Sequence, residues 1–351
     1  MKNLPKVMLC FTVLAGIVLV INGCDGRHPE NPTGWAVGDS VDGYGAILCT
    51  TDAGENWVRQ GSAQDIPAVN LYDASAIDAH KVWVVGANCD GYGVILRTED
   101  GGENWVRQGS AQQIPDVEFL GVSAVDKHTA WVVGMQGTIL NTTDGGKTWI
   151  RQAEGMAPDA ELQAVYAVDS RNVWAVGKSS DTVATILRTS DGGDTWVRQG
   201  SAEDLPTNHL IDISAPDSST AWAAGGDYSF LLTTDGGISW TNHQPVMGLY
   251  DANGVCAVDL DTIWFVTDND GIYYTTDGGV NWTKQTPPVY GYYLMGVSAM
   301  DGQRAWVVGT AWVQDQKGVI LHTSDGGDTW TEQIAPVNTR LRRICFVDAR
   351  K

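Results

Sequence analysis

The stretch "ILRTSDGGDTWVRQG", residues 186–200, decides the fold of this 351-residue chain. A similar string, "ILRTEDGGENWVRQG", occupies residues 95–109, and "ILHTSDGGDTW" occupies residues 320–330. The common pattern T-x-D-x-G-x-[TSN]-W occurs seven times, with its aspartates at Asp52, Asp100, Asp144, Asp191, Asp235, Asp277 and Asp325. Self-similarity with a period of roughly 40–50 residues indicates a repeat architecture such as a solenoid or a propeller.

Two further patterns repeat at the same period. A tryptophan precedes a short apolar run at Trp35, Trp83, Trp131, Trp174, Trp222, Trp264 and Trp306. An apolar stretch ends in aspartate at Asp78, Asp126, Asp169, Asp217, Asp259, Asp301 and Asp348. Each unit therefore predicts four short strands, which in the third unit span residues 120–125, 130–134, 137–142 and 147–152, because these segments are rich in Val, Ile, Trp and Thr. The first two strands of each unit are almost wholly apolar, which is typical of sheets covered on both faces.

The repeated D-x-G turn has a structural explanation. Its glycines supply positive φ angles at low steric cost, and the aspartate side chain accepts hydrogen bonds from nearby backbone N–H groups. The tryptophan that follows would fill the gap between neighbouring sheets, and losing such a side chain costs about 3–5 kcal/mol. The pattern resembles the Asp box, also called the BNR repeat, and we interpret its seven aspartates as structural.

The two ends of the chain complement each other. The first unit, from Trp35, lacks the first of the four strands, whereas the chain finishes on such a strand, "LRRICFVD", residues 341–348. These ends predict an all-β, seven-bladed β-propeller over residues 34–351, closed by the C-terminal strand, which completes the first blade. Closure removes open sheet edges. Six blades with spare strands, or an open solenoid, would leave the complementary ends unexplained.

The N-terminus has the features of a processing signal. Two lysines precede an apolar run over residues 7–21, and "INGC", residues 21–24, resembles the bacterial lipobox. We therefore predict a signal peptide over residues 1–23, lipidation of Cys24, and a polar tether over residues 24–33. An ordinary secretory signal and an uncleaved anchor are the alternatives. Two acyl chains suffice for stable anchoring, so the expected location is extracytoplasmic, on the periplasmic or lumenal side of a bacterial membrane.

The net charge of −20 limits the partners. Affinity for nucleic acid depends on Lys and Arg, so we expect no nucleic-acid partner. The sequence contains no HExxH, Walker or GxSxG motif, and we predict neither a metal nor a cofactor. We expect a monomer that touches the membrane only through its lipid anchor.

In propellers with this strand order, the Asp boxes share one face with the turns between the first and second strands, and the irregular loops form the other face. Binding residues commonly lie on loops held by a rigid scaffold, and Tyr and Trp are frequent interface anchors. The candidate binding face comprises Tyr44, Tyr92, Tyr228, Tyr290, Tyr292, Trp312, Arg342 and Arg343. No catalytic residue is predicted. Asp boxes occur in sialidases, but the three arginines with which sialidases hold the substrate carboxylate are not recognisable here. A pair of glycosidase carboxylates on the loop face is an alternative that the sequence leaves open.

The whole unit resembles the photosystem II stability/assembly factor family. The match is carried by Val125-Asp126, by residues 131–134 ("WVVG") and by residues 137–149 ("GTILNTTDGGKTW"). The resemblance implies a non-enzymatic factor that binds a protein partner and helps assemble a membrane complex in photosynthesis. Members of that family present an arginine-rich patch, whereas here only Arg340, Arg342 and Arg343 cluster. The alternative is a carbohydrate-binding protein or a sialidase-like glycosidase.

Overall fold

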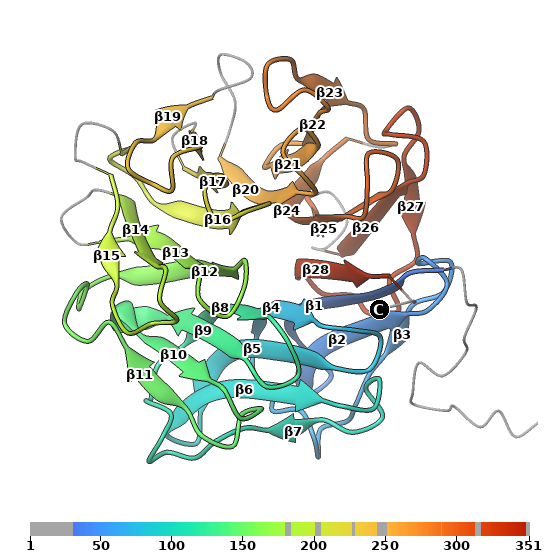
Figure 1. Ribbon diagram of the computed structural model, residues 1–351. Helices are drawn as coiled ribbons and strands as arrows, with labels where there is room; N and C mark the ends of the chain where they lie inside the picture. The colour runs from blue at the N-terminus through green and yellow to red at the C-terminus, as the bar shows by residue number, and fades with distance from the viewer. Residues whose placement is uncertain are drawn as a thin grey trace, which may run out of the picture.

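Seven four-stranded antiparallel sheets surround a central axis as the blades of a propeller (Figure 1). The computed structural model describes residues 31–179, 184–200, 205–226, 229–243, 251–288, 290–312 and 317–348. The prediction of an all-β, seven-bladed propeller is confirmed. Each blade runs outward from the axis, so the first strand of a blade lies inside and its fourth strand forms the outer edge.

The blades follow one another in chain order, and the first of them combines both ends of the chain. The strands of blades 1–4 are β28 (Leu341–Val347), β1 (Thr33–Val41), β2 (Tyr44–Thr50) and β3 (Val58–Arg59); β4 (Leu71–Ala76), β5 (Val82–Cys89), β6 (Tyr92–Thr98) and β7 (Val106–Arg107); β8 (Phe119–Ala124), β9 (Ala130–Gly134), β10 (Ile139–Thr142) and β11 (Ile150–Gln152); β12 (Glu161–Ala167), β13 (Val173–Lys178), β14 (Ala184–Thr189) and β15 (Val197–Arg198). The strands of blades 5–7 are β16 (Leu210–Ser214), β17 (Ala221–Gly225), β18 (Phe230–Thr233) and β19 (Thr241–Asn242); β20 (Ala252–Ala257), β21 (Ile263–Thr267), β22 (Gly271–Thr275) and β23 (Thr283–Gln285); β24 (Tyr292–Ala299), β25 (Ala305–Ala311), β26 (Gly318–Thr323) and β27 (Thr331–Gln333). A 3-10 turn, η1, spans Met135–Gly137. None of the helices formed by the described residues has the length and hydropathy of a transmembrane segment.

The ring closes as the two ends of the chain predict. Strand β28 pairs antiparallel with β1, with Trp35 opposite Cys345 and Gly34 opposite Phe346. In Figure 1 the red C-terminal strand lies beside the blue N-terminal one. The first blade is therefore built from both ends of the chain, and we call its contact with blade 7 the seam.

Tryptophans fill the spaces between blades. At six of the seven interfaces, the Trp of the second strand meets the Asp-box Trp of the next blade edge to face. The Trp83–Trp149 pair, for example, has ring centroids 5.6 Å apart and an interplanar angle of 88°. Both rings are almost fully buried. Edge-to-face packing of this kind adds about 0.5–1.5 kcal/mol beyond the burial of the rings.

Each Asp box is a hydrogen-bonded turn. In the second blade, Asp100 Oδ1 accepts hydrogen bonds from Thr98 Oγ1 at 2.8 Å and from the Asn104 N–H at 3.0 Å. The Gly101 N–H donates to the His80 carbonyl, which lies in the turn between β4 and β5. The Asp boxes and these turns therefore share one face, the Asp-box face, and the remaining loops form the opposite, loop face.

The fourth strands begin later than the sequence predicts. The strand expected over residues 147–152 is β11, which starts at Ile150. The reason is that the Thr148 N–H donates to Asp144 Oδ1 at 2.9 Å, so the residues before Ile150 belong to the Asp-box turn. The outer edges of the blades are therefore short, which limits strand pairing with other chains.

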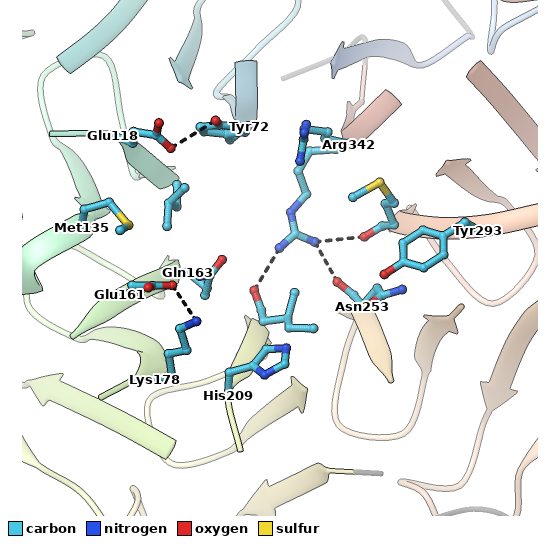
Figure 2. Close-up of a pocket in the computed structure, with 14 residues that line it drawn as sticks. Tyr72, Glu118, Met135, Glu161, Gln163, Lys178, His209, Asn253, Tyr293 and Arg342 are labelled. Atoms are coloured by element: carbon cyan, nitrogen blue, oxygen red, sulfur yellow. Dashed lines mark hydrogen bonds and ion pairs between the residues drawn. The ribbon is translucent and has the colours of Figure 1, made fainter. Parts of the chain in front are cut away.

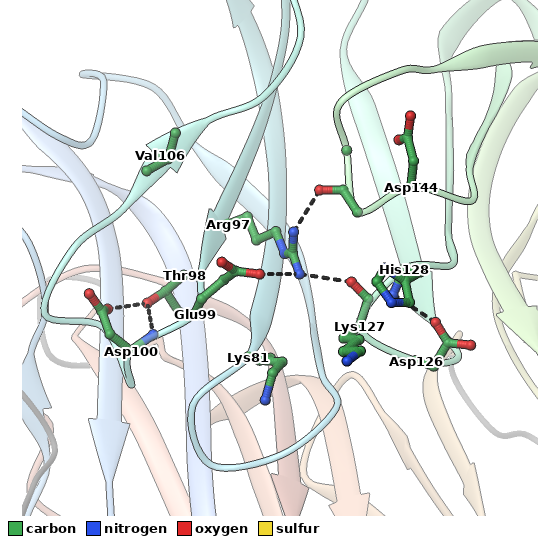
Figure 3. Close-up of polar contacts among 12 residues, drawn as sticks. Lys81, Arg97, Thr98, Glu99, Asp100, Val106, Asp126, Lys127, His128 and Asp144 are labelled. Atoms are coloured by element: carbon green, nitrogen blue, oxygen red, sulfur yellow. Dashed lines mark hydrogen bonds and ion pairs between the residues drawn. The ribbon is translucent and has the colours of Figure 1, made fainter.

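Arginine side chains link neighbouring blades on the Asp-box face. The Arg97 guanidinium lies over the Trp83 ring, 4.7 Å from its centroid, and donates to the carbonyls of Gly145 and Lys127 in the next blade at 2.6 and 2.8 Å (Figure 3). It also pairs with Glu99 at 2.6 Å. Arg188 repeats this arrangement two blades further on, over Trp174.

Candidate functional site

The inner strands of the blades enclose a channel along the propeller axis, and Arg343 of β28 crosses it. Its Nη1 lies 2.9 Å from Asp212 Oδ2 on β16, and its Nε lies 3.9 Å from Asp73 Oδ1 on β4. Nη2 also donates to the Ile211 carbonyl at 3.3 Å. These three charged side chains are only 15–16% exposed. One arginine thus joins three blades and blocks the channel.

Small residues make room for this cluster. At the level of Asp73, Asp212 and Arg343, the other inner strands carry only glycine or alanine, namely Gly121, Ala164, Gly254 and Gly296. Each aspartate also binds the next blade, because Asp73 Oδ2 accepts the Val122 N–H at 2.9 Å and Asp212 Oδ2 accepts the Val255 N–H at 2.8 Å. The cluster is therefore both a plug and a set of links between blades.

Burial and charge oppose each other in this cluster. Burial raises the pKa of Asp73 to about 6, although the positive charge of Arg343 and backbone N–H donors act against it. Burial likewise raises the pKa of Asp212. The two carboxylates raise the pKa of the Arg343 guanidinium, despite its burial. The cluster is stable only while the arginine compensates both acids.

Above Arg343 the channel opens on the loop face as a pocket of about 500 Å³, shown in Figure 2. Its wall combines aromatic, thioether, amide and charged side chains. The lining residues are Tyr72, Glu118, Leu120, Met135, Glu161, Gln163, Lys178, His209, Ile211, Asn253, Tyr293, Met295, Arg342 and Arg343. Because Arg343 forms its floor, this pocket is blind.

Several charged groups of the pocket already have partners. Tyr72 Oη donates to Glu118 Oε2 at 3.1 Å, and Lys178 Nζ lies 3.0 Å from Glu161 Oε2 (Figure 2). Arg342 pairs with Asp39 and lies over the Tyr72 ring, 5.0 Å from its centroid. Burial and the negative charge of Glu118 together raise the pKa of the Tyr72 phenol, so Tyr72 stays protonated and donates. The wall is thus polar and largely self-satisfied.

On the other side of Arg343, a second cavity of about 700 Å³ opens on the Asp-box face. Four serine hydroxyls form a layer in it and accept the backbone N–H of the following blade at 3.0 Å, from Ala124 to Ser75, Ala167 to Ser123, Ala257 to Ser214 and Phe346 to Ser298. These serines hold the inner strands in register. Valine, alanine and isoleucine make up much of the remaining wall.

Two of the residues proposed from sequence lie exposed on the loop face. The side chains of Tyr290 and Trp312 are 74% and 69% exposed. Tyr292 is 3% exposed, and its hydroxyl donates to Glu332 Oε2 at 3.0 Å. Burial and Glu332 raise the pKa of Tyr292. The segment at the start of β24 therefore presents Tyr290 outward and is anchored through Tyr292.

Tyr44 and Tyr92 are covered by arginines of the outer strands. The Arg59 guanidinium lies 3.7 Å from the centroid of the Tyr44 ring, and Arg107 lies 3.6 Å from that of Tyr92. Both arginines also donate to backbone carbonyls of the same hairpins. These tyrosines therefore close the ends of blades 1 and 2. Tyr228 and Cys24 lie outside the described residues.

Arg342 and Arg343 both line the pocket, where each is paired with acids. Sequence reasoning missed most of the remaining lining residues. Many of them share one position of the inner strand, occupied by Tyr72, Leu120, Gln163, Ile211, Asn253, Met295 and Arg342. The signal was present, because this position varies widely between repeats, whereas the position two residues later is always a small or branched apolar residue. Among the described residues, no three His, Cys, Asp or Glu side chains are grouped as metal ligands would be.

The fold and its seven hydrogen-bonded boxes define the class as an Asp-box β-propeller with a blind, loop-face pocket. Within this class, residues 91–160 and 109–209 match the family model of the photosynthesis system II assembly factor YCF48, and residues 273–284 match the BNR/Asp-box repeat. The resemblance to photosystem II assembly factors expected from the sequence is confirmed over these segments.

Solved structures with the same fold include assembly factors and a glycosidase. A structure of YCF48 bound to D1 peptide is 21% identical, with a TM-score of 0.58, over 75% of this chain and 82% of that one. YCF48 from Cyanidioschyzon merolae is 22% identical, with a TM-score of 0.55, over 77% and 86%. A GH74 xyloglucanase from Xanthomonas campestris is 13% identical, with a TM-score of 0.61, over 91% of this chain but 55% of the enzyme. At these identities the likeness establishes the fold alone. No curated protein matches the chain significantly.

Proposed function

We propose that this protein is a non-enzymatic binding propeller that takes part in assembling a membrane protein complex. Its partner would insert a polypeptide segment into the loop-face pocket. The match to the YCF48 family model supports this role, as does the structure of a YCF48 bound to D1 peptide. We extend the proposal to location: the chain is anchored by lipid at Cys24 on the extracytoplasmic side of a bacterial membrane.

The observation that carries the proposal is the blind pocket with its paired charges. A glycosidase requires two carboxyl groups about 5–10 Å apart, one of which is held protonated. In this pocket Glu118 accepts a hydrogen bond from Tyr72, and Glu161 is paired with Lys178. The raised pKa values of Asp73 and Asp212 belong to carboxyl groups engaged with Arg343. The geometry therefore suits binding better than acid–base chemistry.

A carbohydrate-binding role is the second candidate. The likeness in fold to a xyloglucanase and the exposed rings of Tyr290 and Trp312 favour it. Aromatic faces are apolar bodies with polar edges, which also suits sugars. In this reading the loop face would hold a glycan in place of a polypeptide.

Affinity capture from native membranes tests the proposal. Leu120→Trp would place a large side chain in the loop-face pocket. The matched control, Val125→Trp, introduces the same residue near the end of the same inner strand, but in the cavity on the Asp-box face. We expect the wild type and Val125→Trp to recover the same membrane complex, and Leu120→Trp to lose it.

Equal recovery by both variants, or no complex with the wild type, would overturn the assembly role. Binding to a glycan array that is lost in Trp312→Ala, or release of sugars from xyloglucan, would establish the alternative. For the anchor, metabolic labelling with a radioactive fatty acid should mark the wild type and not Cys24→Ser. Absence of label in the wild type would exclude lipidation.

A further inference from the structure

Two neighbouring aromatic side chains of blade 7, Tyr293 and Trp312, lead from the surface into the pocket, and Tyr290 is exposed on the adjoining segment. We call Tyr290, Tyr293 and Trp312 the aromatic ridge. The rings of Tyr293 and Trp312 are 6.1 Å apart, and Tyr293 also lines the pocket. Tyr290 and Trp312 are mostly exposed, at 74% and 69%. Large exposed rings next to a pocket mark an interaction surface.

The ridge is held in place by hydrogen bonds between loops. The carboxylate of Asp270, in the turn before β22, accepts the N–H groups of Gly291 and Tyr292 at 2.9 and 2.6 Å. The Trp312 N–H donates to the Gly291 carbonyl at 2.8 Å. Blades 6 and 7 therefore fix the loop jointly. A preorganised surface of this kind binds with a smaller entropic cost.

An acidic group lies beside the ridge. Asp268 follows β21 on the loop face, and its Oδ1 atom is buried without a hydrogen-bond partner. Burial and the negative charge of Asp251 raise the pKa of Asp268 to about 6. Asp268 and Asp251 in turn raise the pKa of Tyr293, together with its burial, while Arg340 acts on Tyr293 in the opposite sense. At neutral pH Asp268 is therefore largely a carboxylate, and it places a negative charge beside the ridge.

We propose that the aromatic ridge and Asp268 bind a lysine or arginine of a basic polypeptide segment, whose adjoining residues enter the pocket. This inference rests on the proposed function and names the chemistry of its partner. A cation over Trp or Tyr gains about 0.5–2 kcal/mol, and attraction to the negative charge of Asp268 adds to it. The net charge of −20 favours a basic segment over an acidic one.

The proposal is tested with a fluorescein-labelled hexalysine peptide and the same peptide fully acetylated on its lysine side chains. Acetylation removes the charge and keeps the aliphatic stems. We expect hexalysine to bind the wild type at least tenfold more tightly than the acetylated peptide. Asp268→Asn and Trp312→Ala should each weaken hexalysine binding about tenfold. Binding to the wild type should strengthen as the pH rises from 5 to 7, and this dependence should be largely absent in Asp268→Asn.

The matched control is Glu103→Gln, which removes one exposed acid from an Asp box on the opposite face. If Glu103→Gln weakens hexalysine binding as much as Asp268→Asn does, only bulk charge is at work and the proposal is wrong. Equal binding of the acetylated peptide would also overturn it. If Asp268→Asn and Trp312→Ala both recover the membrane complex as well as the wild type does, this inference is wrong and the proposed function stands. If the wild type captures no complex, the proposed function itself is wrong.

Discussion

The seam differs from the other six interfaces in how its aromatic rings are packed. At those six, two tryptophans meet edge to face with centroids 5.6–5.9 Å apart. At the seam, Phe346 lies between them, stacked on Trp306 at 3.7 Å and edge-on to Trp57 at 5.9 Å. The inner strand of every other blade carries alanine at the position of Phe346.

The seam also differs in hydrogen bonding. At the six similar interfaces neither indole N–H has a hydrogen-bond partner among the described residues. At the seam, Trp57 Nε1 donates to Gln333 Oε1 at 3.0 Å, and Trp306 Nε1 donates to the Ala53 carbonyl at 2.9 Å. The contact between blades 1 and 7 therefore adds hydrogen bonds from both indoles to ring packing, whereas the indoles at the other six interfaces contribute ring packing alone.

The space for Phe346 comes from the strand beside it. Phe346 pairs with Gly34, where the second blade has Ala76 opposite Val82. A Cβ atom on Gly34 would lie 2.3 Å from the Phe346 ring. At the seam the inner strand therefore carries the large residue, Phe346, and the second strand the small one, Gly34, whereas in the second blade the inner strand has Ala76 and the second strand Val82. The summed volume of the two side chains stays similar. Cores tolerate such volume-conserving exchanges well.

Phe346→Ala should have the largest effect on stability. It removes the ring between Trp57 and Trp306 and leaves a cavity, which costs about 3–5 kcal/mol in the free energy of unfolding. Urea unfolding followed by tryptophan fluorescence measures the loss.

Adding Gly34→Val to this variant should restore part of the loss, because the double variant recreates the Ala–Val pair of the second blade. Gly34→Val alone should destabilise, because its side chain collides with Phe346. A double variant no more stable than Phe346→Ala would contradict the volume-exchange explanation.

Arg343→Met should rank second, at about 3 kcal/mol, because it leaves Asp73 and Asp212 buried without their cation. The raised pKa of Asp73 means that its protonated form is favoured in the folded state. Its contribution to stability is therefore present below pH 4 and lost as the pH rises through about 6. In Arg343→Met this decline should steepen. Unfolding at pH 4 and 7 measures it, with the triple variant Arg343→Met, Asp73→Asn, Asp212→Asn as control. Failure of the triple variant to regain stability at pH 7 would refute the charge argument.

Trp57→Phe and Trp105→Phe should separate packing from hydrogen bonding. Both remove one indole, but only Trp57→Phe leaves Gln333 Oε1 without its donor. We expect Trp57→Phe to be more destabilising than Trp105→Phe by about 1 kcal/mol. Thermal or urea unfolding of the two variants gives this difference. Equal losses would mean that the seam hydrogen bond contributes nothing beyond packing.

The smallest effects should come from the Asp boxes in acid. Hydrogen bonds from Thr148 lower the pKa of Asp144 to about 2, so its stabilising contribution is present above pH 4 and fades as the pH falls towards 2. At the seam box, burial opposes the donors that lower the pKa of Asp52. The stability difference between wild type and Asp144→Asn should vanish near pH 2, and the difference for Asp52→Asn should also shrink in acid, because the pKa of Asp52 is lowered as well. Thermal midpoints between pH 2 and 6 measure both. A difference that persists at pH 2 would count against the hydrogen-bond explanation.

The repeats allowed much of the fold to be predicted. Three independent patterns placed the blades, and the unmatched strand at residues 341–348 predicted that the C-terminal strand completes the first blade. The exchange between Gly34 and Phe346 was not foreseen, because it becomes visible only when the register of β1 and β28 is known. The late start of β11 was missed because the Asp-box turn includes the residues up to its tryptophan, Trp149.

The candidate site was predicted less completely. Arg342 and Arg343 were proposed from their clustering, and both line the pocket. The inner strands were treated as uniform structural strands, so Tyr72, Gln163 and Asn253 were overlooked. Tyr44 was proposed from its loop position alone. In the structure the Arg59 guanidinium stacks on the Tyr44 ring across the edge of the blade. Such a contact between side chains cannot be recognised from the spacing of residues in the sequence.

Because β28 belongs to the blade that β1 begins, the order of synthesis constrains the order of folding. Blades 2 to 7 can pair their own strands as the chain emerges, but the first sheet stays one strand short until the C-terminal segment arrives. Long-range strand pairing of this kind slows folding. Until then the unpaired edge of β1 is open to foreign strands, so a chaperone acting on this protein would protect that edge.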